Sequence, residues 1–164
     1  MITGATKNKV DDVWQKMWEG GITNPIEVIS QLTYLMFMRS LDEKEFEIER
    51  IEMLTEEPQS HIFPQTPEGQ QMRWNRFKDL DPEAMLNVVQ NEAFPYIKAL
   101  NDGTPFSTCM EGATFGIQNP RTLQKAVSGI DNLMRDFDEH IGDLGDLYEY
   151  MLSKLSTAGT NGQF

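Results

Sequence analysis

Residues 20–54, GGITNPIEVISQLTYLMFMRSLDEKEFEIERIEML, decide the fold. Asn24 is a favoured helix N-cap, and Pro25 suits the first helical position, where its missing N–H costs nothing. No glycine or proline interrupts the rest of the stretch, so we predict one long helix over residues 25–54. Residues 34–38, YLMFM, make that helix apolar on every side, and such a helix must be surrounded by others. We therefore predict a central core helix; an amphipathic surface helix is the alternative.

Helical spacing of apolar residues predicts further helices around the central one. The expected ranges are 8–19, 69–78, 82–100 with a kink or break at Pro95, 120–137 and 145–155. Residues 55–68 hold three prolines, and residues 101–119 are rich in Gly, Ser and Thr, so both stretches are predicted loops. The sequence shows no convincing strand alternation and no internal repeat. The predicted fold class is all-α, a multi-helix bundle around the long central helix.

The 164 residues, 39% hydrophobic and 24% charged, are enough for one domain with a substantial core. We expect residues 1–155 to form a helical domain and residues 156–164, small and polar, to form a linker. No run approaches the roughly 18 apolar residues that span a bilayer, and the N-terminus has no apolar signal region. The single Cys109 excludes an internal disulfide framework. Together these features predict a cytoplasmic protein with no membrane partner.

The net charge of −12 lies in two segments. Residues 42–57 hold eight acids and two bases, a sum of −6, and residues 131–149 hold seven acids and one base, again −6. The acidic surface of the first segment is either a solvated face or a docking surface for a basic protein. So acidic a chain is a poor free-standing DNA binder, because neutralising phosphates supplies most of that affinity. A more basic partner or another domain would have to carry most of the contact with DNA.

Motifs of the common enzyme classes are absent from the sequence. It has no glycine-rich phosphate loop and no nucleophile elbow. Two histidines, His61 and His140, and one cysteine cannot build a zinc site at any standard spacing, so we expect no metal site. Residues 119–122, NPRT, are best explained as a helix cap followed by a proline. We predict no catalytic residue in this chain.

Three stretches resemble the modification (M) subunit of type I restriction–modification DNA methyltransferases. Residues 20–43, GGITNPIEVISQLTYLMFMRSLDE, are similar to the opening of that subunit, where a Gly-Gly pair precedes a long apolar helix. Residues 116–133, GIQNPRTLQKAVSGIDNL, are similar to its third signature helix. Residues 143–164, DLGDLYEYMLSKLSTAGTNGQF, resemble the segment that leads into its catalytic domain. The resemblance covers nearly all of residues 9–164 and implies an N-terminal helical domain of such a subunit.

In the whole subunit, the resemblance implies methyl transfer from S-adenosyl-L-methionine to N6 of adenine in DNA. The family's cofactor-binding glycines and its Asn-Pro-Pro-aromatic catalytic motif are not in this chain, so whether the chain is itself an enzyme stays open and we expect it to bind no cofactor alone. Gln163 and Phe164 match the start of the stretch flanking the cofactor and could contribute at its edge. The implied partners are the specificity (S) subunit, a second M subunit and the restriction subunit, with DNA bound through the complex. A stand-alone α-helical protein-interaction adaptor is the alternative.

Within such a complex, these N-terminal domains are expected to contribute to closure around DNA. The predicted DNA-facing residues are Arg73, Arg76, Lys78, Arg121 and Lys125, with Lys7, Lys9 and Lys16 as weaker candidates. The first three form the densest basic group in the chain. A solvated basic helix face is the alternative for that group, because three charges give little affinity for a phosphate backbone.

Overall fold

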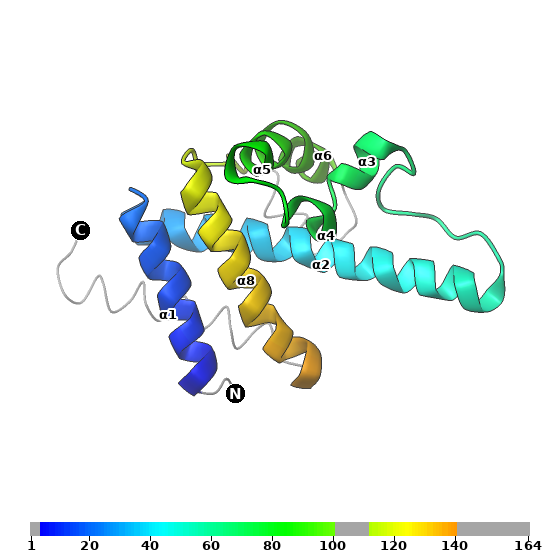
Figure 1. Cartoon of the computed structure of the whole chain (residues 1–164), viewed down its shortest axis with the longest axis horizontal. Helices are drawn as coiled ribbons and strands as arrows, with labels where there is room; N and C mark the ends of the chain where they lie inside the picture. Colours follow the sequence, from blue (N-terminus) through cyan, green and yellow to red (C-terminus); the bar gives the residue numbers. More distant parts are fainter. Residues whose placement is uncertain (1–3, 101–111, 141–164) are drawn as a thin grey trace. The chain divides into compact units, whose positions relative to one another are not determined.

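The computed structural model describes residues 4–100 and 112–140, with side chains as far as residue 135. Regular structure in these residues is entirely helical, which confirms the predicted all-α class (Figure 1). The elements are α1 (Gly4–Glu19), α2 (Pro25–Thr55), α3 (Pro67–Gln71), α4 (Trp74–Phe77), α5 (Pro82–Val88), a π-helical turn η1 (Val89–Ala93), α6 (Phe94–Ala99) and α8 (Pro120–His140). The predicted helix over 145–155, the domain boundary at 155 and the linker 156–164 lie outside the described residues. None of the described helices combines the length and apolar character needed to cross a membrane.

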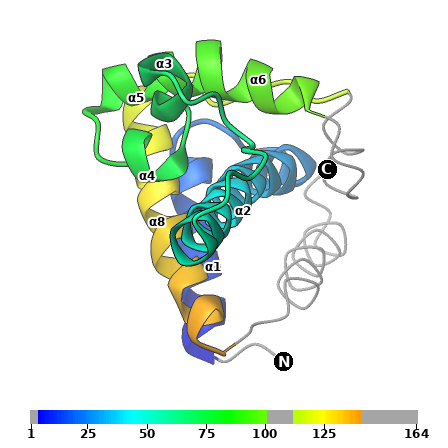
Figure 2. The same ribbon diagram turned by 90° about the vertical axis from the view of Figure 1, so that its right-hand side faces the viewer.

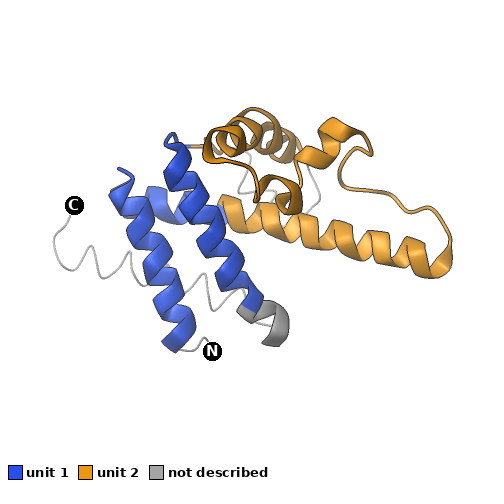
Figure 3. Cartoon of the chain, in the orientation of Figure 1, with its two compact units in different colours: residues 1–33, 116–164 blue, residues 34–115 orange. Residues whose placement is uncertain are grey.

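The chain divides into two compact units, which Figure 3 shows in separate colours. Unit 1 comprises residues 1–33 and 116–164, and unit 2 comprises residues 34–115. Helix α2 supplies its first turns to unit 1 and the rest of its length to unit 2.

In unit 1, α1 and α8 lie side by side and run in opposite directions (Figures 1 and 2). Two glycines permit the close approach: a β-carbon on Gly129 would collide with the side chain of Val13, and one on Gly20 would collide with Thr122. The apolar side chains that the two helices bury are Val10, Val13, Met17, Leu123, Ala126, Val127, Ile130, Leu133 and Met134. Helix α1 begins one turn earlier than predicted, because Thr6 is also buried and extends this face.

The end of α1 follows the sequence prediction. Gly21 has φ +97°, the left-handed conformation that glycine adopts without strain. The N–H of Ile22 donates to the carbonyl of Met17 at 3.1 Å, closing the helix end. Oδ1 of Asn24 then accepts the N–H of Ile26 at 2.9 Å, so the predicted cap starts α2.

Helix α2 matches the predicted range to within one residue at its end. Leu35, Met36, Phe37 and Met38 are each no more than 4% exposed, which confirms that this segment is core. Ile26, an apolar residue near the start of the same helix, is 58% exposed. It lies in the first turn of the helix on the side away from Pro25, Val28 and Ile29, which are buried.

Unit 2 packs shorter helices with the later part of α2. Asp81 caps α5 by accepting the N–H of Ala84 at 3.3 Å. The kink or break predicted at Pro95 is instead the π-helical turn η1, which lies directly before α6. Figure 2 shows α5 and α6 in line on either side of this turn. A proline ring crowds the carbonyl four residues earlier, at Asn91, and the wider turn relieves that clash. The ring of Phe94 lies 5.6 Å from that of Tyr34 and 5.4 Å from that of Phe115, measured between centroids.

The single helix predicted over residues 69–78 is two short helices, α3 and α4. The backbone of Arg73 is extended, with φ −79° and ψ 140°, and so separates them. The reason lies in the contacts of Arg73 with α2, described next.

Candidate functional site

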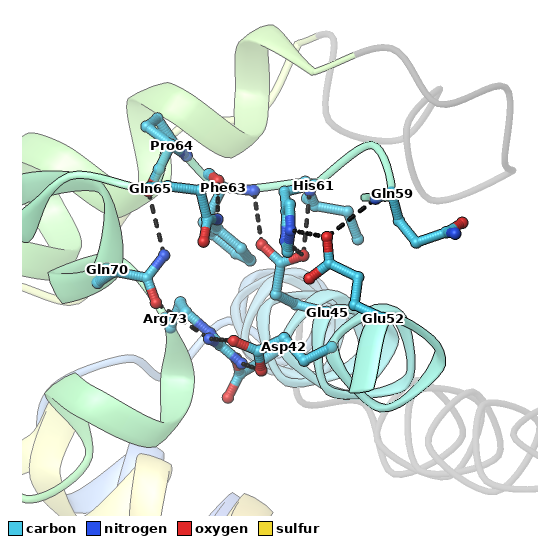
Figure 4. Close-up of polar contacts among 12 residues, drawn as sticks. Asp42, Glu45, Glu52, Gln59, His61, Phe63, Pro64, Gln65, Gln70 and Arg73 are labelled. Atoms are coloured by element: carbon cyan, nitrogen blue, oxygen red, sulfur yellow. Dashed lines mark hydrogen bonds and ion pairs between the residues drawn. The ribbon is translucent and has the colours of Figure 1, made fainter. Parts of the chain in front are cut away.

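Four carboxylates lie on one face of α2 in unit 2, and Figure 4 labels three of them, Asp42, Glu45 and Glu52. Asp42, Glu45, Glu49 and Glu52 are spaced three, four and three residues apart, which places them on one side of a helix. Asp42 is 2% exposed and Glu45 is 0% exposed. We call these four residues the carboxylate stripe.

Two residues of the carboxylate stripe, Glu45 and Glu52, bind the loop after α2 through His61. Nδ1 of His61 lies 3.0 Å from Oε1 of Glu45, and Nε2 lies 2.9 Å from Oε2 of Glu52. The same two carboxylates accept backbone N–H groups of the loop: Phe63 donates to Glu45 and Gln59 donates to Glu52, each at 2.9 Å. The predicted loop is therefore fastened along the helix, as Figure 4 shows.

Hydrogen bonds and electrostatic attraction between His61 and the two carboxylates shift the pKa values of the groups involved. Burial works to lower the pKa of His61, but hydrogen bonds and the negative charges of Glu52 and Glu45 outweigh it, and the pKa is raised above its ordinary value. The pKa of Glu52 is lowered, first by the N–H of Gln59 and then by His61. Both ring nitrogens face a carboxylate oxygen, which is the arrangement of an imidazolium.

The other two residues of the carboxylate stripe, Asp42 and Glu49, bind Arg73. Nε of Arg73 donates to Oδ1 of Asp42 at 2.5 Å, while Nη1 and Nη2 donate to the two oxygens of Glu49 at 3.0 Å each. The guanidinium also lies 4.7 Å from the centre of the Phe46 ring, within cation–π distance. Burial works to lower the pKa of Arg73, but the hydrogen bonds and charges of Glu49 and Asp42 raise it. Arg73 therefore remains a cation inside the unit.

Asp42 also provides a cap that α4 lacks. The N-cap position of α4 is Arg73, whose side chain makes no capping hydrogen bond. Instead Oδ2 of Asp42 accepts the N–H of Asn75, in the first turn of α4, at 2.9 Å. A carboxylate at a helix N-terminus also interacts favourably with the helix dipole. One side chain of α2 thus neutralises Arg73 and starts α4.

These contacts decide what the stripe can do chemically. Each of its four carboxylates accepts at least one hydrogen bond from a residue of the loop or of α4's start. These hydrogen bonds hold the loop after α2 and the start of α4 against α2. Among the residues that the structure describes, no group of His, Cys, Asp and Glu side chains is arranged to hold a metal ion. The site is a fastening for the loop and for α4.

The structure separates the predicted DNA-facing residues. Arg73 is only 3% exposed and is paired within unit 2, so it leaves that set; the prediction for it was wrong. Arg76 is exposed on α4, and Lys78, just after α4, is half-buried. Arg121 and Lys125 are exposed one turn apart on α8, in unit 1.

Of the weaker candidates, all on α1, Lys7 is exposed, whereas Lys9 and Lys16 are half-buried. Nζ of Lys16 lies 3.9 Å from Oδ1 of Asp12. Gln163 and Phe164, the predicted cofactor-flanking residues, lie outside the described part of the chain.

Unit 1 contains a hollow of about 390 Å³ between the end of α1 and the start of α8. Its lining is Gly20, Gly21, Ile22, Gly116, Ile117, Gln118, Asn119, Pro120 and Thr122. The nearby N–H groups of Arg121 and Thr122 already donate to Oδ1 of Asn119. These two N–H groups at the start of α8 therefore already have hydrogen-bond acceptors within the chain.

Sequence reasoning missed the pairing of the carboxylate stripe with His61 and Arg73. A signal was present: four acids at helical spacing define one face, and a histidine and an arginine follow within the next 21 residues. Reading the acidic segment only as solvated or as a dock for a basic partner overlooked a third use, as an internal anchor.

Comparison with known proteins identifies the family of the chain. Residues 6–130 match the family model described as the HsdM N-terminal domain. The chain is 22% identical, over 174 aligned positions, to the type I restriction enzyme EcoEI methylase subunit of Escherichia coli. That alignment covers 100% of this chain and 34% of the relative, so the chain spans about a third of the relative's length. No solved structure matches the chain significantly. With most of its length matched by the family model, the chain belongs to the HsdM N-terminal domain family of type I methylase subunits.

Proposed function

We propose that this chain is the assembly domain of a type I modification methylase, which holds the subunits together and helps to close them around DNA. The observation that carries the proposal is the family match over residues 6–130, which includes all but the first two residues of α1, all of α2 to α6 and the first half of α8. The chain's net charge of −12 supports a role in protein contact rather than independent DNA binding.

In the longer protein, the proposed reaction is transfer of the methyl group of S-adenosyl-L-methionine to N6 of adenine in DNA. The catalytic and cofactor-binding groups would come from outside this chain, with Gln163 and Phe164 contributing at the edge of the cofactor site. The chain alone should therefore give no saturable heat when titrated with S-adenosylmethionine in a calorimeter. A clearly saturable heat of binding would contradict the proposal that the cofactor-binding groups lie outside this chain.

The proposed partners are the specificity subunit, a second modification subunit and the restriction subunit, with DNA held through the complex. Four exposed or half-buried cations remain as proposed DNA-facing residues: Arg76, Lys78, Arg121 and Lys125. Four cations contribute little DNA affinity, so they would add to contacts with DNA that the specificity subunit provides.

Methyl transfer by the reconstituted complex tests the proposal. The full-length subunit with its specificity subunit should incorporate labelled methyl groups into DNA as N6-methyladenine. A version lacking residues 1–155 should still bind S-adenosylmethionine but should lose methylation of DNA, because its partners would no longer be held. Undiminished methylation by the deleted version would contradict an assembly role, and methylation at another atom would contradict the proposed reaction.

A further inference from the structure

The second half of α2 carries a concentration of exposed apolar side chains. Among the described residues, six large hydrophobic side chains are exposed, and four of them fall between residues 46 and 54. Phe46 is 42% exposed, Ile51 38%, Met53 81% and Leu54 76%. We call these four residues the outer face. Exposed apolar side chains concentrated in one segment mark a site of interaction more often than single exposed side chains do.

Helix geometry gives the spread of the outer face around α2. At 3.6 residues per turn, Phe46, Met53 and Leu54 lie within an arc of about 100°, and Ile51 lies about 60° beyond Leu54. The exposed ion pair of Arg50 and Glu47 lies between these apolar side chains. Phe46 and Met53 border the carboxylate stripe, while Leu54 and Ile51 carry the apolar surface farther around the helix. Residues 46–54 of α2 extend for roughly 13 Å along the helix axis, which matches the length of two to three turns of a partner helix.

The carboxylate stripe holds this surface in place. Arg73 lies against Phe46, and His61 ties the loop to Glu45 and Glu52 on the adjoining side of the same helix. A helix fixed in this way presents its outer face with little ordering left to do on binding, and preorganisation of that kind favours affinity.

The charges beside the outer face select the partner. Glu43, Glu47, Glu56 and Glu57 are exposed there, against Lys44 and Arg50, which leaves a sum of −2. Two of these acids are already paired within the chain: Glu47 lies 2.6 Å from Arg50, and Glu43 lies 3.8 Å from Arg39. A second copy of this acidic chain would meet like charge, and nucleic acid or an anionic membrane would be repelled. A basic segment with an apolar side has both complementary properties.

We propose that the outer face is a docking surface for a basic amphipathic helix of another subunit in the assembled methylase. This inference rests on the proposed assembly role and deepens it, because it names the surface and the chemistry of the partner. Apolar contact supplies the affinity, and the acidic residues orient the partner and reject anionic surfaces.

A photoreactive amino acid at position 53 of the full-length subunit tests the proposal in the reconstituted complex. It should crosslink to a Lys- and Arg-rich helix of a different subunit, identified by mass spectrometry. The matched control is the same group at position 98 on α6, where Lys98 is exposed and far along the chain from the outer face. A crosslink to a second copy of this chain, to DNA, or to no subunit at all would overturn the proposal.

Substitution provides the energetic test. Met53→Glu with Leu54→Glu should weaken subunit association at least about tenfold, whereas Met53→Leu should preserve it. Both sites are largely exposed, so unfolding midpoints should stay unchanged, and this comparison separates lost docking from lost folding. If wild type assembles and the double variant assembles equally well, the docking surface is contradicted while the assembly role stands. If wild type itself fails to assemble, both are contradicted.

Discussion

Nε of Arg73 lies 2.5 Å from Oδ1 of Asp42, although the two residues are 31 positions apart in the chain. Their side chains are 4% and 3% exposed, respectively. The pair therefore fastens the start of α4 to α2 from inside the unit. It also removes from the surface a cation that the sequence suggested would face DNA.

Arg73→Met should lower the free energy of unfolding by about 3–5 kcal/mol, because Asp42 would stay buried without its cation. Urea unfolding of the chain, followed by helical circular dichroism, measures the change. The matched control is Arg76→Met, three residues on and exposed, which should change the value by no more than about 0.5 kcal/mol. Equal midpoints for the two variants would show that the buried pair does not stabilise unit 2.

Stability should depend on pH through His61. Its pKa in the folded chain is raised, so its contribution is complete below its ordinary pKa of about 6.5 and is lost as pH rises through the raised value. Unfolding midpoints should therefore fall as pH rises above about 6.5, and His61→Gln should remove that part of the dependence. A wild-type profile that remains as flat as that of the variant over this range would refute the assignment.

Glu52 should act in the opposite direction. Its pKa is lowered in the folded chain, so its contribution is present above its ordinary pKa of about 4.3 and is lost as pH falls through the lowered value. Glu52→Gln should reduce the loss of stability on acidification in that range. The exposed Glu57→Gln is the control, and if it behaves identically the contact of Glu52 with Gln59 and His61 has no energetic role.

Gly129→Ala should destabilise unit 1 by about 1–3 kcal/mol, because the added β-carbon meets Val13 on α1. A valine in a helix has one strongly preferred rotamer and gives way poorly. Val13→Ala in the same chain should recover part of the loss, and a double-mutant cycle of unfolding free energies measures that coupling. Gly4→Ala, with no atom near the new carbon, is the control. Additive effects at positions 13 and 129 would contradict the close approach of α1 and α8.

Arg121→Gln with Lys125→Gln should reduce the salt dependence of DNA binding by the assembled complex. If both cations contact phosphates, the slope of log affinity against log salt should fall in magnitude by about 2. Arg135→Gln, farther along α8 with a 67% exposed side chain, is the control and should leave the slope unchanged. An unchanged slope in the double variant would exclude these two residues from the DNA-facing set.

Local patterns predicted the central helix and its core, because both depend on residues close together in the sequence. Asn24 and Pro25 start α2 as expected, and four of the five residues of the all-round apolar segment 34–38 are buried as expected, while Tyr34 is half-buried. The pairing of Asp42 with Arg73 could not be derived in this way. It joins positions 31 residues apart, and helical periodicity gives the face on which a carboxylate lies but not which distant cation will reach it.

The same limit explains the division into α3 and α4. The apolar spacing over residues 69–78 fits one helix, but Arg73 takes an extended backbone and reaches Asp42 and Glu49. A tertiary contact thus overrode local helix propensity. Among the candidate site residues, Arg76, Arg121 and Lys125 are exposed, and their contact with DNA stays a prediction.

Subunit stoichiometry tests the central claim, that this helical chain assembles the methylase, most directly. Native mass spectrometry would compare the full-length subunit with a version lacking residues 1–155, each mixed with the specificity subunit. We predict a complex of two modification subunits with one specificity subunit for the full-length protein, and loss of that complex for the deleted version while its remaining domain stays folded. The same stoichiometry in both mixtures would contradict the claim.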